Sequence, residues 1–176
     1  MRKSMVGAVL AFSLAGCVSM LGPVDDTPIA AQFDAGAMAP IMQRGSASIS
    51  GQASMKGQDG TVAPAAGAKV LLWPATPFTH ELAQKMAAGQ AQTAANAQLQ
   101  PYARSTVTDA GGTFGFYGLP AGAYVVVLPF QLQSSTEDQT TSRAGALWQE
   151  VSVKDNQQGR VALSGNANPK AKKAAP

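Results

Sequence analysis

The fold of this chain is decided by one stretch, STVTDAGGTFGFYGLPAGAYVVVL, residues 105–128. Its first half holds the turn Asp-Ala-Gly-Gly, in which the side chain of Asp109 can bond to the backbone ahead of it and the glycines can adopt a positive φ. Directly after this turn, Phe114 and Phe116 alternate with glycines, so both rings point to one face of a strand. The pattern predicts a tight hairpin with an aromatic core face.

A second turn follows at once, in the sequence Leu119-Pro120-Ala121-Gly122. Pro120 fixes φ at the second turn position and Gly122 stands at the fourth, which fits a type I turn. Because this turn joins two apolar strands, we expect a β-branched residue in place of Gly122 to strain the backbone. The valine-rich run 123–130 then supplies the next strand, with alternate residues on the core face.

Similar runs of β-branched and aromatic residues continue on both sides, separated by Gly, Pro, Asn and Asp. Together, the predicted strands are residues 47–55, 68–74, 102–108, 113–119, 123–130, 145–155 and 159–165. Seven short strands predict an all-β fold: a single seven-stranded antiparallel sandwich of immunoglobulin-like or prealbumin-like type, with one helical insertion. The chain has a single cysteine, so this one domain must be held by hydrophobic burial without a disulfide.

The stretch 105–128 resembles the motif of carboxypeptidase regulatory-like domains. Both have a polar strand, Asp-x-x-Gly, an aromatic-x-aromatic pair, Leu-Pro-x-Gly and a valine-rich strand that begins with Tyr. GSASISGQASM at 45–55 resembles the opening strand of that family, and LWQEVSVKDNQQGRVAL at 147–163 its closing pair. The resemblance covers residues 46–165 and implies a β-sandwich that accompanies other proteins without catalysing a reaction itself. Segment 75–101, which compact members of the family lack, is the insertion.

The insertion has a helical pattern. Thr76 is predicted to cap a helix and Pro77 to occupy its first position. Three apolar residues four apart stack on one face of this helix: Phe78, Leu82 and Met86. In the preceding strand AKVLLWP, Val70 and Leu72 face the core, which leaves Leu71 and Trp73 on the outer face. Burying a large apolar side chain contributes about 1.5–3 kcal/mol, so we expect the helix to fold back over that face. The alternative is a mobile lid for a partner or ligand.

The N-terminus has the layout of a secretory signal: a basic head, a short apolar run and small residues before Cys17. The run is too short for a transmembrane helix, which needs about 20 apolar residues. Leu-Ala-Gly-Cys at 14–17 resembles the lipobox of bacterial lipoproteins. This resemblance implies a signal peptide over residues 1–16, cleavage between Gly16 and Cys17, and attachment to a lipid bilayer through acyl chains such as palmitate on Cys17. Val18 in place of Asp implies the outer membrane, with the domain facing the periplasm or the cell surface.

Two further segments flank the predicted domain. Residues 17–45 are expected to be a lipid-anchored flexible tether, because prolines and glycines interrupt them and no period is sustained. Residues 166–176 are expected to be a disordered basic tail. Of the 13 basic residues, Arg2 and Lys3 leave with the signal, so 11 face 10 acidic residues. That balance offers no basic surface, and no nucleic-acid partner is predicted.

The sequence contains few residues that could catalyse a reaction or bind a metal. The chain has one histidine, His80, whereas catalytic triads and metal sites need several convergent His, Asp or Glu side chains. We therefore predict no enzyme activity, no metal and no cofactor. The aromatic residues Trp73, Phe78 and Tyr102 form a candidate sugar-stacking face, unless they belong to the core.

Three functions remain open on the sequence alone. The first is a structural or binding role in the cell envelope, with an envelope protein or a glycan as partner. The second is a carbohydrate-binding or peptidoglycan-binding module, which requires clustered exposed aromatic residues. The third is an assembly lipoprotein of a secretion system with a transthyretin-like sandwich.

Overall fold

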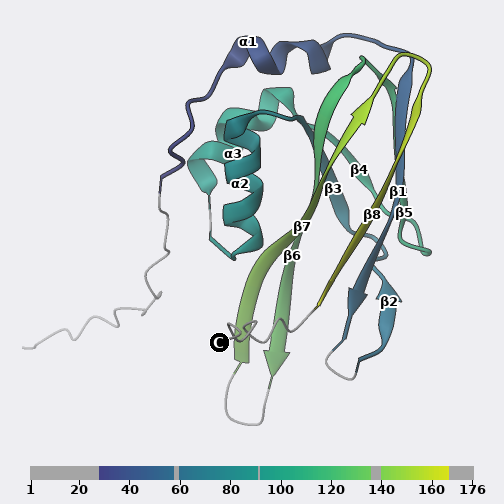
Figure 1. Cartoon of the computed structure of the whole chain (residues 1–176). Helices are drawn as coiled ribbons and strands as arrows, with labels where there is room; N and C mark the ends of the chain where they lie inside the picture. Colours follow the sequence, from purple (N-terminus) through teal and green to yellow (C-terminus); the bar gives the residue numbers. More distant parts are fainter. Residues whose placement is uncertain (1–27, 58–59, 91, 136–139, 167–176) are drawn as a thin grey trace, which may run out of the picture.

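The computed structural model describes residues 28–57, 60–90, 92–135 and 140–166. Two four-stranded sheets pack face to face, and helices cover the outer face of one of them (Figure 1). The predicted all-β sandwich with a helical insertion is confirmed at this level. The predicted signal peptide, Gly16 and Cys17, the tether as far as residue 27, and the tail beyond residue 166 lie outside the described residues. No helix in the described part of the chain is long and apolar enough to cross a membrane.

The first sheet is built around β1 (Ala47–Lys56). One edge of β1 pairs antiparallel with β5 (Thr113–Leu119) and then with β2 (Val62–Pro64), while the other edge pairs with β8 (Gln158–Asn166). The β1–β8 pair is parallel, so the prediction of an entirely antiparallel sandwich is wrong there. Because β7 lies in the other sheet, the turn before β8 carries the chain across the sandwich, and β8 runs beside β1 in the same direction.

The second sheet has the order β4-β3-β6-β7 and is antiparallel throughout. Its strands are β3 (Lys69–Pro74), β4 (Arg104–Val107), β6 (Gly122–Ser135) and β7 (Thr140–Val153). With β2 the described strands number eight rather than seven. The pattern missed β2 because it is three exposed residues long and ends in proline.

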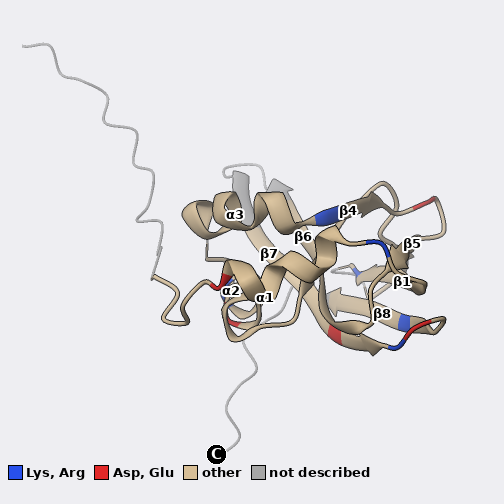
Figure 2. Ribbon diagram, turned by 90° about the horizontal axis from the view of Figure 1, so that it is seen from above, with Lys and Arg blue, Asp and Glu red and all other residues tan. Residues whose placement is uncertain are grey.

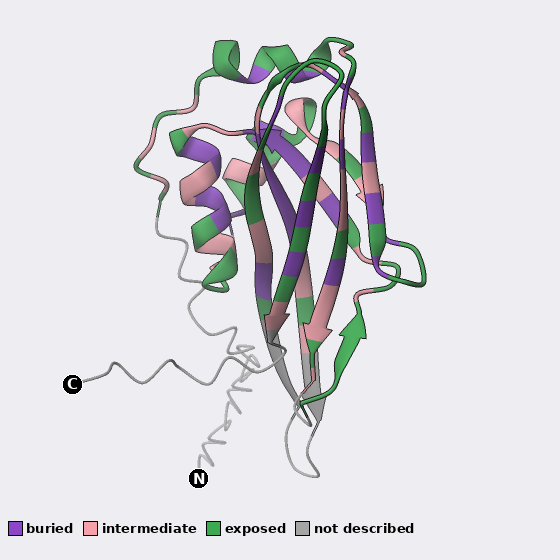
Figure 3. Ribbon diagram, turned by 45° about the vertical axis from the view of Figure 1, so that its right-hand side comes forward, coloured by how far each residue is buried: buried purple, intermediate pink, exposed green. Residues whose placement is uncertain are grey.

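The main core lies between the two sheets and is filled by alternate residues of their strands (Figure 3). Its members include Ile49, Leu72, Phe114, Phe116, Leu119, Tyr124, Val126, Leu128 and Leu163. The two phenylalanines point inward together, with ring centres 6.2 Å apart. The alternation that predicted this core face is therefore confirmed.

A second core lies between the outer face of the β4-β3-β6-β7 sheet and the helices. Val125 and Val127 of β6 belong to it, whereas Val126 belongs to the main core, so β6 is buried on both faces. A strand buried on both faces reads as a continuous apolar run rather than an alternation, which is why 124–128 contains five apolar residues in succession. Leu71 and Trp73 of β3 also enter this second core.

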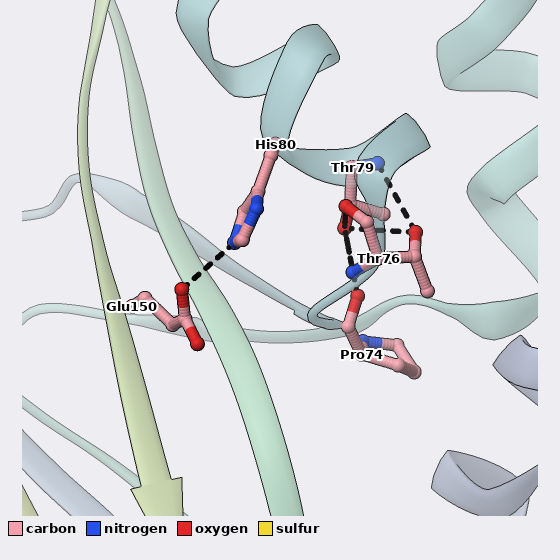
Figure 4. Close-up of polar contacts among 5 residues, drawn as sticks. All are labelled: Pro74, Thr76, Thr79, His80 and Glu150. Atoms are coloured by element: carbon pink, nitrogen blue, oxygen red, sulfur yellow. Dashed lines mark hydrogen bonds and ion pairs between the residues drawn. The ribbon is translucent and has the colours of Figure 1, made fainter. Parts of the chain in front are cut away.

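The cover is α2 (Pro77–Ala87), as expected from the stripe four residues apart. Thr76 accepts a hydrogen bond from the Thr79 N–H at 3.2 Å, and the Thr79 hydroxyl accepts one from the Thr76 N–H at 2.9 Å (Figure 4). This capping box starts the helix beside the end of β3, because the Thr79 hydroxyl also donates to the carbonyl of Pro74. Gly89, with φ +83°, ends it.

The segment before β1 is not a free tether over its described part. Residues 28–45 include α1 (Ala35–Met38) and the 3-10 turn η1 (Ala39–Met42), and they bury Met38 and Ile41 against the two cores. The sequence pattern failed here because the buried side chains follow no single period. Their burial instead depends on contacts with elements far along the chain.

Two charged side chains clamp this N-terminal segment to the domain. The carboxylate of Glu81 on α2 accepts the backbone N–H groups of Ala30 and Ala31, both at 2.9 Å. The guanidinium of Arg104 on β4 donates to the carbonyls of Ile41 and Gln43. The same guanidinium also donates to two carbonyls at the end of β5, so it ties the segment to both sheets.

Glu81→Gln is expected to loosen residues 28–45 at neutral pH. The N–H groups of Ala30 and Ala31, aided by Lys85, hold the pKa of the Glu81 carboxyl below its usual value, although partial burial opposes them. Since the folded pKa is lowered, this contribution to stability is complete above the ordinary glutamate pKa of about 4.3 and is lost as the pH falls through the folded pKa.

Amide hydrogen exchange of residues 28–45, measured between pH 7 and pH 3, tests the clamp. After correction for the intrinsic exchange rate, the wild type should lose protection at the acidic end. The Glu81→Gln variant should already be less protected at pH 7 and should vary less with pH. Asp155→Asn, which alters an exposed carboxylate in the turn between β7 and β8, is the control and should behave as wild type. Equal protection of Glu81→Gln and wild type at pH 7 would refute the clamp.

Candidate functional site

A groove runs between the helical insertion and the outer face of the β4-β3-β6-β7 sheet. It consists of two adjacent hollows of about 500 and 660 Å³, and Met86, Asn96 and Pro129 line both of them. We call it the amide groove, because side-chain amides dominate its polar lining: Gln90, Gln92, Asn96, Gln100 and Gln131. Each hollow has the size of an ordinary small-ligand pocket.

The helical wall of the amide groove is α3 (Thr93–Leu99) with the 3-10 turn η2 (Gln100–Tyr102). Leu99 is fully buried and fixes the inner side of this wall. Thr93, Asn96 and Gln100 recur every three or four residues, so they form one stripe along the groove. Asn96 is half-buried at the centre of that stripe, where the two hollows meet.

The floor of the groove is apolar. Leu71 and Trp73 come from β3, and Pro129 and Phe130 from β6. Trp73 is only 1% exposed, and its indole N–H has no hydrogen-bond partner among the described residues. A buried indole N–H usually has a partner, so this orphan donor is unusual.

The lining is almost uncharged. Among the described residues that line the groove, Lys69 is the charged one and none is acidic. Figure 2 shows α3 without Lys, Arg, Asp or Glu along its length. An amide group donates and accepts in one plane, so this lining suits a neutral ligand with alternating donors and acceptors.

The predicted aromatic face is not an exposed platform. Trp73 and Phe78 are buried in the second core, and Tyr102 is half-buried. Phe33 packs against both Phe78 and Tyr102, with ring centres 5.4 and 5.8 Å away. The structure thus brings Phe78 and Tyr102 together around the Phe33 ring, but this cluster is packed beneath the N-terminal segment and is not an exposed face. Sequence reasoning missed Phe33 because it lies in the expected tether.

The residues of the first turn motif have structural roles. Asp109 accepts from the backbone N–H of Gly111 at 2.9 Å and of Thr113 at 2.8 Å. Gly112 follows with φ +75°. The predicted turn chemistry at Asp109 and Gly112 is therefore confirmed.

The second turn is locked by a tyrosine. Leu119 is fully buried, and the carbonyl of Pro120 accepts the hydroxyl of Tyr124 at 2.8 Å. Burial raises the pKa of the Tyr124 phenol, although Arg104 partly opposes the shift, so the phenol remains a donor. Gly122 begins β6 without a positive φ, and an added Cβ would meet only the Tyr124 ring at 3.8–3.9 Å. The expected backbone strain at Gly122 is therefore wrong.

His80 lies outside the amide groove. Its Nε2 is 2.9 Å from Glu150 Oε2 on β7 (Figure 4). Its ring centre is 5.9 Å from that of Trp148. The pair joins α2 to β7 and extends the helical cover over the sheet. Within the described ranges, no group of three or more His, Cys, Asp or Glu side chains could hold a metal ion.

No family model and no curated protein matches the chain, so its likeness to carboxypeptidase regulatory-like domains stays a prediction. Among solved structures, a Pseudomonas aeruginosa protein proposed to bind carbohydrate is similar over 76% of this chain and 98% of its own, with a TM-score of 0.60 and 23% identity. A streptococcal ancillary pilin aligns with 68% of this chain and 32% of its own, with a TM-score of 0.36 and 15% identity. The first of these matches shows a shared sandwich fold.

Proposed function

We propose that this chain is a lipid-anchored protein of the bacterial cell envelope whose β-sandwich binds a glycan without catalysing a reaction. The observation that carries the glycan part is the amide groove, a nearly uncharged hollow with an apolar floor and five amide side chains. Glycans present hydroxyl groups that both donate and accept, above apolar ring faces. The similarity to the Pseudomonas aeruginosa protein supports the proposal by showing that the same fold accompanies a proposed carbohydrate-binding role.

We expect the full-length protein, solubilised in detergent, to be retained on at least one immobilised neutral polysaccharide. Cellulose, amylose, chitin and isolated peptidoglycan form a suitable panel, and affinity is measured by depletion from solution. The heat-unfolded protein is the control for nonspecific adsorption. Failure of the folded protein to bind any member would reject glycan binding and leave a purely structural role.

We further propose that the acylated Cys17 anchors the protein in the outer membrane, facing the periplasm or the cell surface. The lipobox-like sequence and the single cysteine support this proposal. Two or more acyl chains bind a bilayer far more strongly than one, which alone is marginal.

Cys17→Ser is expected to abolish the anchor and to leave the protein uncleaved or soluble. Phase separation in a detergent that clouds on warming measures the change, because a lipidated protein enters the detergent-rich phase. Ser19→Ala, two residues away, is the matched control and should partition as wild type. Recovery of Cys17→Ser in the detergent phase as a cleaved product would contradict lipidation at this residue.

A further inference from the structure

We infer that the amide groove is the ligand site and that it takes an extended, uncharged oligosaccharide, held at its centre by Asn96 and from its floor by the indole N–H of Trp73. This inference rests on the proposed glycan-binding function and specifies its site and ligand class.

The lining charges favour a neutral ligand. With Lys69 as the charged residue of the described lining and no acidic side chain, the groove lacks the array of cations that an acidic polysaccharide requires. A cationic ligand would find no carboxylate in this lining to pair with. An uncharged ligand loses the least on leaving water for such a site.

The hydrogen-bonding groups favour hydroxyls as partners. Asn96 and Gln100 lie four residues apart along one face of the helical wall, so their amides can contact neighbouring units of an extended ligand. Each amide offers donors and an acceptor in one plane, which matches pairs of adjacent hydroxyl groups.

The indole N–H of Trp73 is a donor that the protein itself leaves unused. Leaving a buried donor unpaired is costly, so a ligand oxygen that accepts from it recovers that loss. Because Trp73 is 1% exposed, a neighbouring side chain must turn aside first. Met86 lines both hollows and packs in the same cluster as Trp73, and its unbranched thioether side chain has the freedom to move.

The backbone pairing of the floor argues against a peptide ligand. At Leu71 and Leu72, β3 pairs with β4 on one side and with β6 on the other, so no strand can be added there. Where β6 separates from β3, after Val127, it carries Pro129, which has no N–H to offer. At this part of the floor, a peptide would therefore be denied the main-chain bonds through which strand addition gives affinity. We therefore expect the side chains that line the groove to recognise the ligand.

The shape of the groove favours several sugar units over one. Its two hollows are adjacent at Met86, Asn96 and Pro129, and each is large enough for a small ligand. A short sugar would fill one hollow, whereas an oligosaccharide would occupy both. Asn96 contacts the ligand in either hollow because it lines both.

The test uses full-length protein in detergent and isothermal titration with defined probes. The neutral probes are cellohexaose, maltohexaose and chitohexaose with their disaccharides, the acidic probe is hexagalacturonate, and the peptide probe is an uncharged glycine–serine peptide. We expect a neutral hexasaccharide to bind at least about tenfold more tightly than its disaccharide. Asn96→Ala should weaken that binding about tenfold, and Trp73→Phe should weaken it by a similar factor.

A matched control lies on the same helix. Gln98 is exposed on α3 and lines neither hollow of the groove, so Gln98→Ala removes an amide outside the groove and should leave affinity within about twofold. Asn96→Ala truncates a half-buried side chain that belongs to neither core, so this variant is expected to fold. The test of the site therefore remains valid even if Trp73→Phe does not fold. Fluorescence of Trp73 in a Trp148→Phe background should also shift on binding.

The outcomes separate the two proposals. Binding of a neutral hexasaccharide that Asn96→Ala and Gln98→Ala affect equally, with no change in Trp73 fluorescence, would place the site elsewhere and overturn this inference alone. Preference for hexagalacturonate or for the peptide would overturn the ligand class. Absence of binding by every sugar would reject the glycan-binding function and this inference with it.

Discussion

Gly112→Ala is expected to lower the free energy of unfolding by about 2–4 kcal/mol. Gly112 has φ +75°, a region that costs a residue with a Cβ about 1–2 kcal/mol. A Cβ at this position would also collide with the backbone carbonyl oxygen of Ala53 and lie 3.2 Å from the Pro64 side chain. That carbonyl accepts the N–H of Ala65, and the carbonyl of Gly112 accepts the N–H of Ala53 at 2.8 Å, so neither chain can move away without losing a bond.

Gly122→Ala is the matched control, because Gly122 closes the other turn of the same stretch. Its φ is not positive and an added methyl group has room, so we expect a change within about 0.5 kcal/mol. Urea denaturation followed by far-ultraviolet circular dichroism measures both variants. Equal destabilisation of the two would mean that the hairpin at Gly112 is not the constrained turn.

The second large effect is expected at Leu82 of α2, whose side chain is fully buried between the helix and the sheet. Leu82→Ala should cost about 2–5 kcal/mol, since it removes a buried side chain and leaves a cavity. Leu82→Asp should cost more, because it places an unpaired carboxylate in the second core. The expected consequence of Leu82→Asp is release of α2 from the sheet, which exposes Trp73.

Acrylamide quenching in a Trp148→Phe background reports Trp73 alone. At 1% exposure, Trp73 should be quenched slowly in the otherwise unaltered chain and rapidly after Leu82→Asp. Gln84→Asp places the same carboxylate on the exposed face of α2 and is the control; it should leave quenching slow. Slow quenching in the folded Leu82→Asp protein would show that α2 is not what covers Trp73.

Much of the sandwich was predictable because its signals are local. Asp109 and Gly112 define a turn through bonds within five residues, and Phe114 and Phe116 reveal a core face by simple alternation. The cover over Trp73 followed from one further step, since Leu71 and Trp73 on the outer face of the strand required burial. These inferences need no knowledge of distant contacts.

The parts that sequence reasoning missed depend on contacts between distant segments. Met38 and Ile41 are buried against elements far along the chain, and Arg104, some 60 residues later, holds the carbonyl of Ile41. The amide groove was also invisible, because Asn96 and Gln100 look like ordinary polar residues in an Ala/Gln-rich segment until the sheet is placed beneath them. The prediction of an exposed aromatic face was wrong because Trp73 is buried in the second core.

The clamp on the N-terminal segment sets how far the sandwich can stand from a bilayer. With an anchor at Cys17, as proposed, only residues 18–27 separate the acylated residue from the described segment, and ten residues span at most about 35 Å when fully extended. A tether free as far as residue 45 would allow roughly 95 Å. The shorter limit confines the domain to a shell close to the membrane surface. Under the proposed glycan-binding function, the glycan partner must therefore come close to the membrane.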